Sequence, residues 1–154
     1  MLFRSVLTEG DDQQDPIADA ARAILDGHIV LSRELAESGH YPAIDVEASI
    51  SRVITEVVDS EHLRLVQRFR HLYSIYHQNQ DLINVGAYTP GADSRIDEAI
   101  QLHPHLLAFL TQGMRTPMNW QESVQCLKSL FANHDAENAA TQAQPHAMLD
   151  PTRA

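Results

Sequence analysis

Short alternating runs of apolar and polar residues dominate the first third of the chain. The run AIDVEASISRVI, residues 43–54, places apolar side chains two apart with polar ones between them, as in a half-buried strand. FRSVLT at 3–8 and HIVLS at 28–32 predict two further strands. PIADAARAILDG at 16–27 and RELAESG at 33–39 predict short helices. The alternation of strands and helices predicts an α/β region with a mainly parallel sheet.

After residue 56 the apolar spacing becomes helical. Residues 60–86 carry an apolar stripe over several turns, with Ser60 as the expected N-cap. Three further helices are expected at 94–102, behind Pro104 over 104–112, and at 119–131 with Asn119 as the cap. We therefore predict three parts: an α/β region at 1–56, an all-α bundle at 57–132 and a disordered tail at 133–154.

Arg52 interrupts the alternation of the third strand. It falls on the apolar side of the period, where a guanidinium is costly to bury without an anionic partner. An ordinary structural explanation is an ion pair with Glu47, Glu56 or Asp59. Composition alone does not decide between this explanation and a functional one.

Charge and cysteine content narrow the classes of function. The 154 residues include 21 Asp and Glu against 11 Lys and Arg, a formal charge of −10. No basic stripe is present, which argues against nucleic acid as a partner and disfavours anionic membrane surfaces. No apolar run approaches the roughly 20 residues of a membrane span. Cys126 is alone, which excludes a disulfide framework within the chain and fits a reducing cytoplasm.

Local motifs give little chemistry. The pairs His71 and His77, and His103 and His105, lack the spacing of a helical zinc site, so we expect solvated or capping histidines and no metal. The acidic cluster at 9–15 could bind a cation, act as a base or start a helix, and helix initiation is favoured. GxxxxGK[ST], GxGxxG and GxSxG do not occur, so no phosphate cradle is visible. Tyr41 precedes Pro42; it could stack on a base or cover the sheet, and the core position is favoured.

Several ordered motifs carry more information than these single residues. The pieces EGDD…DPIAD, ILDGHIVLSR, GHYPAIDV and SISRV occur in order within residues 6–54. Together they resemble the end of the catalytic domain of the type III export ATPases, relatives of the rotary ATP synthase catalytic subunits. QDLINVGAYTPGADSRIDEAIQL and LLAFLTQGM…NWQESVQCLKSLF extend the resemblance to about residue 131 and look more like the flagellum-specific members. MLFRS departs from the family pattern.

The resemblance implies a fold and roles for two residues. The expected architecture is the end of a RecA-like nucleotide-binding domain followed by a small helical bundle, mostly α overall. Arg52 would be an arginine finger that projects into the nucleotide site of a neighbouring subunit, and Tyr41 would lie near adenine. ATP and Mg²⁺ would be bound mainly by residues that lie upstream in the family. We therefore expect this chain to be the C-terminal third of such a protein and inactive alone.

The family also implies partners and a location. The full protein would be a homohexamer that hydrolyses ATP to drive export of flagellar proteins. It would work at the cytoplasmic face of the export apparatus, with peripheral membrane association at most. Its partners would be export chaperones, flagellar substrates, a regulator and a stalk protein. The alternatives are a virulence-type injectisome ATPase and a non-catalytic helical module that binds chaperones or a regulator.

Overall fold

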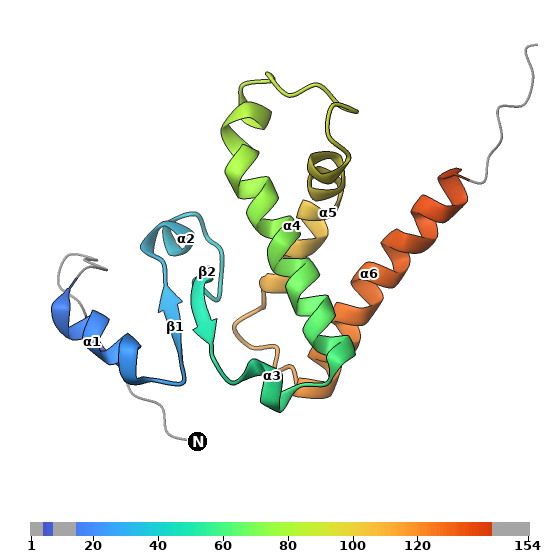
Figure 1. Ribbon diagram of the computed structural model, residues 1–154. Coiled ribbons are helices and arrows are strands. Elements are labelled where there is room, and N and C mark those ends of the chain that lie inside the picture. The colour runs from blue at the N-terminus through green and yellow to red at the C-terminus, as the bar shows by residue number, and fades with distance from the viewer. Residues whose placement is uncertain (1–4, 8–14, 143–154) are drawn as a thin grey trace, which may run out of the picture. The chain divides into compact units, whose positions relative to one another are not determined.

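The computed structural model describes residues 5–7 and 15–142, which belong to two compact units, 1–117 and 118–154 (Figure 1). Residues 5–7 have no regular secondary structure. The rest of the strand predicted at 3–8 lies outside the described residues, as does the acidic cluster apart from Asp15.

The first helix, α1 (Pro16–Ile24), begins where the sequence predicts. The Asp15 carboxylate accepts hydrogen bonds from the backbone N–H groups of Ile17 and Ala18, at 2.7 and 3.0 Å. Pro16 occupies the first turn, where its missing N–H costs nothing. Asp15 is therefore a helix cap, which agrees with the helix-starting interpretation of the acidic cluster at this position.

The two strands run antiparallel, so the prediction of a mainly parallel sheet is wrong for the described part of the chain. β1 (Gly27–Leu31) pairs with β2 (Ile44–Ser51). Their connection contains α2 (Arg33–Glu37), a helix of 5 residues that spans only about 7–8 Å. Such a helix cannot return the chain along the length of a strand. Instead, Ser32 N–H donates to the Ala43 carbonyl at 2.9 Å and joins the two ends of the connection.

The helices α4 (Ser60–Asn84) and α5 (Ser94–Leu110) form the apolar core of the first unit and follow α3 (Ile54–Val57). Asp59 caps α4 in place of the expected Ser60, because its carboxylate accepts the His62 N–H at 2.7 Å. Arg68 of α4 pairs with Glu98 of α5 at 2.8 Å. The buried apolar residues of these two helices are Leu65, Phe69, Leu72, Tyr73, Ala99, Leu102 and Leu106.

α5 is one continuous helix, whereas the sequence predicted two helices divided at Pro104. Proline inside a helix costs about 3 kcal/mol. Ala99, Leu102 and Leu106 are all nearly inaccessible to solvent and stay on one face across the proline. Burial of each leucine contributes about 1.5–3 kcal/mol, which offsets the lost hydrogen bond.

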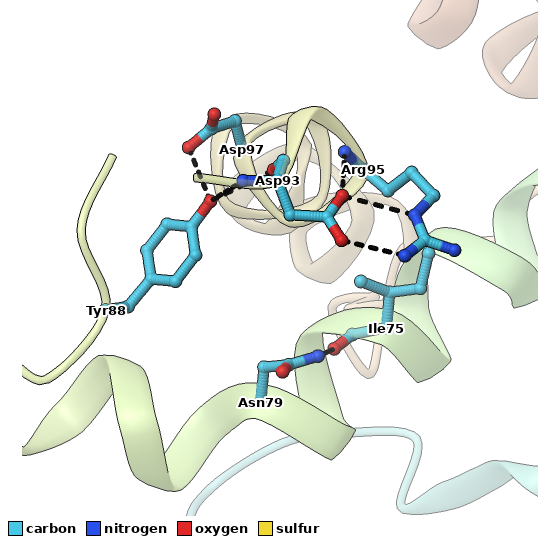
Figure 2. A network of polar contacts seen from close by, with 6 residues as sticks. All are labelled: Ile75, Asn79, Tyr88, Asp93, Arg95 and Asp97. Carbon is cyan, nitrogen blue, oxygen red and sulfur yellow. Dashed lines mark hydrogen bonds and ion pairs between the residues drawn. The ribbon is translucent and has the colours of Figure 1, made fainter. Parts of the chain in front are cut away.

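The loop between α4 and α5 is closed by a polar network (Figure 2). Tyr88 Oη lies 2.9 Å from Asp97 Oδ1 and 3.0 Å from the Asp93 carbonyl oxygen. Loss of solvent contact, together with the hydrogen bond to Asp97, raises the pKa of Tyr88. Gly91 N–H donates to Asp97 Oδ2 at 2.9 Å, and its φ of 88° is one that glycine adopts without strain. This network fixes the start of α5.

The second unit contains α6 (Trp120–Gln142). Asn119 is its cap, as predicted: Glu122 N–H donates to Asn119 Oδ1 at 2.9 Å, and Asn119 N–H donates to Glu122 Oε2 at 3.1 Å. The helix continues to Gln142, past residue 133, where we expected a disordered tail to begin. Alanine, glutamate and glutamine have high helix propensity and prolong a helix without an apolar stripe. Residues 143–154 lie outside the described part.

Candidate nucleotide-facing site

Arg52 follows the last residue of β2 and is exposed. Its Nη1 donates to the Ala23 carbonyl at 3.0 Å and its Nη2 donates to the Arg22 carbonyl at 3.1 Å. Both carbonyls belong to the last turn of α1. The carbonyls of a last turn have no N–H partner within the helix, and this end of the helix carries the negative end of its dipole. The Arg52 backbone N–H also donates to the Asp26 carbonyl at 2.7 Å. Arg52 is thus fixed by α1.

This geometry replaces the ordinary explanation that the sequence offered. Within residues 15–142, no ion pair joins Arg52 to Glu47, Glu56 or Asp59. The apolar period of the strand does not apply to Arg52, because β2 ends at Ser51. The guanidinium has more N–H groups than its bonds to α1 use, so it can also contact an anion.

Tyr41 lies before the opposite end of β2. Tyr41 is 52% exposed, so the described part of the chain does not bury it as the core interpretation expected. The Tyr41 carbonyl accepts the Gln112 N–H at 2.9 Å, and the Tyr41–Pro42 peptide bond is cis. His40 Nδ1 lies 3.4 Å from Thr111 Oγ1. These contacts join the backbone of the loop to the end of α5 and leave the aromatic ring accessible.

The structure does not bring Tyr41 and Arg52 together. No hydrogen bond, ion pair or ring contact between them is present in the described part of the chain, and they lie at opposite ends of β2. The described residues also contain no group of three or more His, Cys, Asp or Glu side chains that could hold a metal ion.

Two histidines pack in an aromatic cluster, an arrangement that sequence reasoning missed. The rings of Tyr76 on α4 and His103 on α5 are stacked with centroids 3.4 Å apart. His77 lies 4.4 Å from Tyr73 by ring centroids, and its Nδ1 is 3.3 Å from Glu47 Oε2. Burial, and secondarily the nearby His77, lowers the pKa of His103. Helical spacing places Tyr73, Tyr76 and His77 near one another, but it does not predict their partners on α5 and β2.

Comparison with known proteins gives these residues a context. A family model described as the T3SS EscN ATPase C-terminal domain matches residues 58–129. The nucleotide-binding domain of the ATP synthase alpha/beta family matches residues 1–51. The flagellum-specific ATP synthase of Salmonella typhimurium is 58% identical over 129 residues, which are 84% of this chain and 28% of that protein. The chain belongs to the family of flagellar and type 3 secretion ATPases.

Other members of this ATPase family support the assignment. The type 3 secretion system ATPase of Pseudomonas syringae pv. syringae is 49% identical over 126 residues, which are 82% of this chain and 28% of that protein. The assembled ATPase EscN of enteropathogenic Escherichia coli is 42% identical with a TM-score of 0.78, over 81% of this chain and 30% of that one. The RecA-like end followed by a helical part is therefore confirmed. The chain spans less than a third of the length of these relatives.

Both residues singled out in the sequence lie at informative places relative to the family models. Tyr41 falls inside the segment that matches the nucleotide-binding domain, and Arg52 follows its last matched residue directly. The side chains that hold β2, including Arg70, His28 and Ser49, were not predicted at all, because their contacts join residues far apart in the sequence.

Proposed function

We propose that this chain is the C-terminal part of a flagellar protein export ATPase. The whole enzyme hydrolyses ATP in a homohexameric ring and drives export of flagellar proteins. The observation that carries the proposal is the 58% identity with the Salmonella flagellum-specific ATP synthase over 129 residues, across both the nucleotide-binding and the helical segments. The phosphate-binding loop, the catalytic glutamate and the magnesium-site aspartate belong to other parts of the enzyme, so these 154 residues alone do not turn over ATP.

Arg52 acts in this proposal as an arginine finger toward ATP on the neighbouring subunit. Arg52 is exposed and therefore accessible to a ligand. The α1 carbonyls hold its planar guanidinium in one orientation, so the remaining N–H groups can bind phosphate oxygens without further loss of side-chain entropy. A planar, permanently charged group that contacts two phosphate oxygens stabilises charge that develops in the transition state. In GTPases such a finger contributes about 10³–10⁵ in rate.

Tyr41 is proposed to lie near adenine. An exposed aromatic ring on a loop whose backbone is fixed to α5 can stack on a base with little conformational cost. Mg²⁺ is proposed to accompany ATP and to be bound mainly outside this chain. The separation between Tyr41 and Arg52 suits this division of roles, because a finger that acts in trans serves a different nucleotide from the one beside Tyr41.

In this proposal residues 1–56 complete the nucleotide-binding domain and 57–132 form the helical domain. Residues 133–154 follow as a C-terminal extension, of which 133–142 continue α6. The family models, which end at 51 and begin at 58, support the first boundary.

The partners are export chaperones, flagellar substrates, a regulator and a stalk protein. One EscN structure is a complex with its central stalk, EscO. We also propose that the enzyme works at the cytoplasmic face of the export apparatus. The part of the chain that the structure describes contains no candidate membrane-spanning helix.

The runner-up is an injectisome ATPase with the same chemistry. The 49% identity with the Pseudomonas syringae enzyme supports the injectisome alternative. The higher identity, 58%, with the Salmonella flagellar protein favours the flagellar function. Exchange of segments separates the two. One chimera carries this chain in place of the matching 129 residues of the Salmonella protein, and a second carries it in place of the matching 126 residues of the Pseudomonas protein.

We expect both chimeras to hydrolyse ATP and only the first to restore motility to a strain that lacks its own flagellar ATPase. The purified 154-residue chain is the control and is expected to show no turnover. Assembled chimeras without ATPase activity would contradict the proposed enzyme class. Restored secretion without restored motility would favour the injectisome alternative.

A further inference from the structure

In the middle of β2, side-chain hydrogen bonds replace the regular backbone pairing with β1. The register changes between His28 and Val30: His28 faces Ile50, whereas Val30 faces Asp45. The β2 residues between these partners therefore lack regular pairing with β1. His28 Nε2 lies 3.1 Å from the Ala48 carbonyl oxygen, and the Val30 N–H donates to Ser49 Oγ at 3.0 Å. Two residues that pair with β1, Ile50 and Ser51, separate this irregular stretch from Arg52.

Arg70 of α4 binds the same stretch from the helical side. Its Nη1 donates to the Ser49 carbonyl at 3.2 Å and its Nη2 donates to the Glu47 carbonyl at 3.1 Å. Carbonyls two residues apart on a strand point to the same side, so one planar guanidinium can bind both. About two turns further along α4, His77 contacts the Glu47 carboxylate at 3.3 Å. The 58–129 segment is thereby joined to the nucleotide-binding segment.

We propose that Arg70 is a positioning residue for Arg52. Without Arg70, the irregular part of β2 keeps the contacts of His28 and Ser49 and the His77–Glu47 contact, but its backbone loses two hydrogen bonds to α4. The backbone that leads into Arg52 then becomes free to shift, and a displacement of about 1 Å at a catalytic group can cost about 10²-fold in rate. The effect requires a catalytic Arg52, so this proposal rests on the proposed function.

The Salmonella chimera provides the test, with Arg70→Ala, Arg70→Lys and, as a matched control, Arg64→Ala on the exposed side of the same helix. We expect Arg70→Ala to lower kcat about tenfold with normal hexamer assembly and a KM for ATP within about twofold of the parent. Lysine cannot bridge both carbonyls, so Arg70→Lys should restore only part of the rate. Arg64→Ala should leave kcat unchanged. Hydrogen exchange at the Arg52 amide, which donates to Asp26, should accelerate in Arg70→Ala.

A double variant separates positioning from a general structural effect. Arg52→Ala with Arg70→Ala should turn over no more slowly than Arg52→Ala alone, because the positioned group is already gone. If the two substitutions lowered kcat independently, so that the double variant was slower than Arg52→Ala by the full factor of Arg70→Ala, the proposal would be overturned. An unchanged kcat in Arg70→Ala would also overturn it. If Arg70→Ala does not assemble, Arg70→Lys decides: reduced kcat in intact hexamers supports positioning, whereas normal kcat or failed assembly overturns it. Normal turnover in Arg52→Ala would instead contradict the proposed function of Arg52.

Discussion

The segment 16–51 and the helix pair α4–α5 are stabilised in different ways. In α4 and α5, seven apolar residues are buried. Among residues 16–51, all of which are described, only Ala18 is a buried apolar residue. Larger apolar residues of this segment are mostly exposed: Ile17 by 76%, Ile24 by 83%, Ile29 by 63% and Leu31 by 73%. Caps, backbone hydrogen bonds and the guanidinium contacts of Arg52 and Arg70 hold this segment.

The difference indicates which part of the chain depends on further protein. Apolar burial makes the helix pair largely self-sufficient. In the segment 16–51, exposed isoleucines and leucines require cover that the described residues do not supply. In our proposal the remainder of the nucleotide-binding domain supplies it, and Arg52 lies at the edge of that domain.

The largest expected effect on stability lies in the helix pair. Leu102→Ala removes a side chain that is 1% exposed and should lower the free energy of unfolding of α4–α5 by about 2–5 kcal/mol. Ile24→Ala, at 83% exposure in α1, is the matched control and should change it by less than about 0.5 kcal/mol. Thermal unfolding of the 154-residue chain followed by circular dichroism measures both. Equal effects of the two substitutions would remove the contrast between the regions.

The sequence predicted local elements better than their pairing. Asp15, Asn119 and the period-2 run at 43–54 define α1, α6 and β2 through contacts between neighbouring residues. The antiparallel pairing depends on the Ser32–Ala43 bond, and the continuous α5 depends on burial across Pro104. Neither is encoded in local periodicity. The family resemblance selected Arg52 and Tyr41, but the α1 carbonyls that hold Arg52 could be found only in the structure.

A smaller effect of pH is expected at the start of α5. Hydrogen bonds from the Arg95 side chain and backbone lower the pKa of Asp93 from 3.8 to about 2. The ionised carboxylate therefore stabilises the folded state fully above pH about 4, and this contribution is lost as the pH falls through about 2. Asp93→Asn, a variant without a titrating group, should show a weaker loss of stability over this interval. Identical acid unfolding profiles for the parent and the variant would contradict the assignment.

The most direct test of the central claim is the turnover of the Salmonella chimera carrying Arg52→Ala. We predict intact hexamers, nearly unchanged ATP binding and a kcat lower by about two orders of magnitude or more, since a finger acts on charge that develops in the transition state. Arg52→Lys should not restore the rate. Mixing Arg52→Ala subunits with subunits that lack a functional phosphate loop should recover part of it, because some interfaces then combine an intact loop with an intact arginine. If Arg52 only caps α1, its loss would lower the melting temperature while intact hexamers kept the parental turnover, and that result would contradict the account.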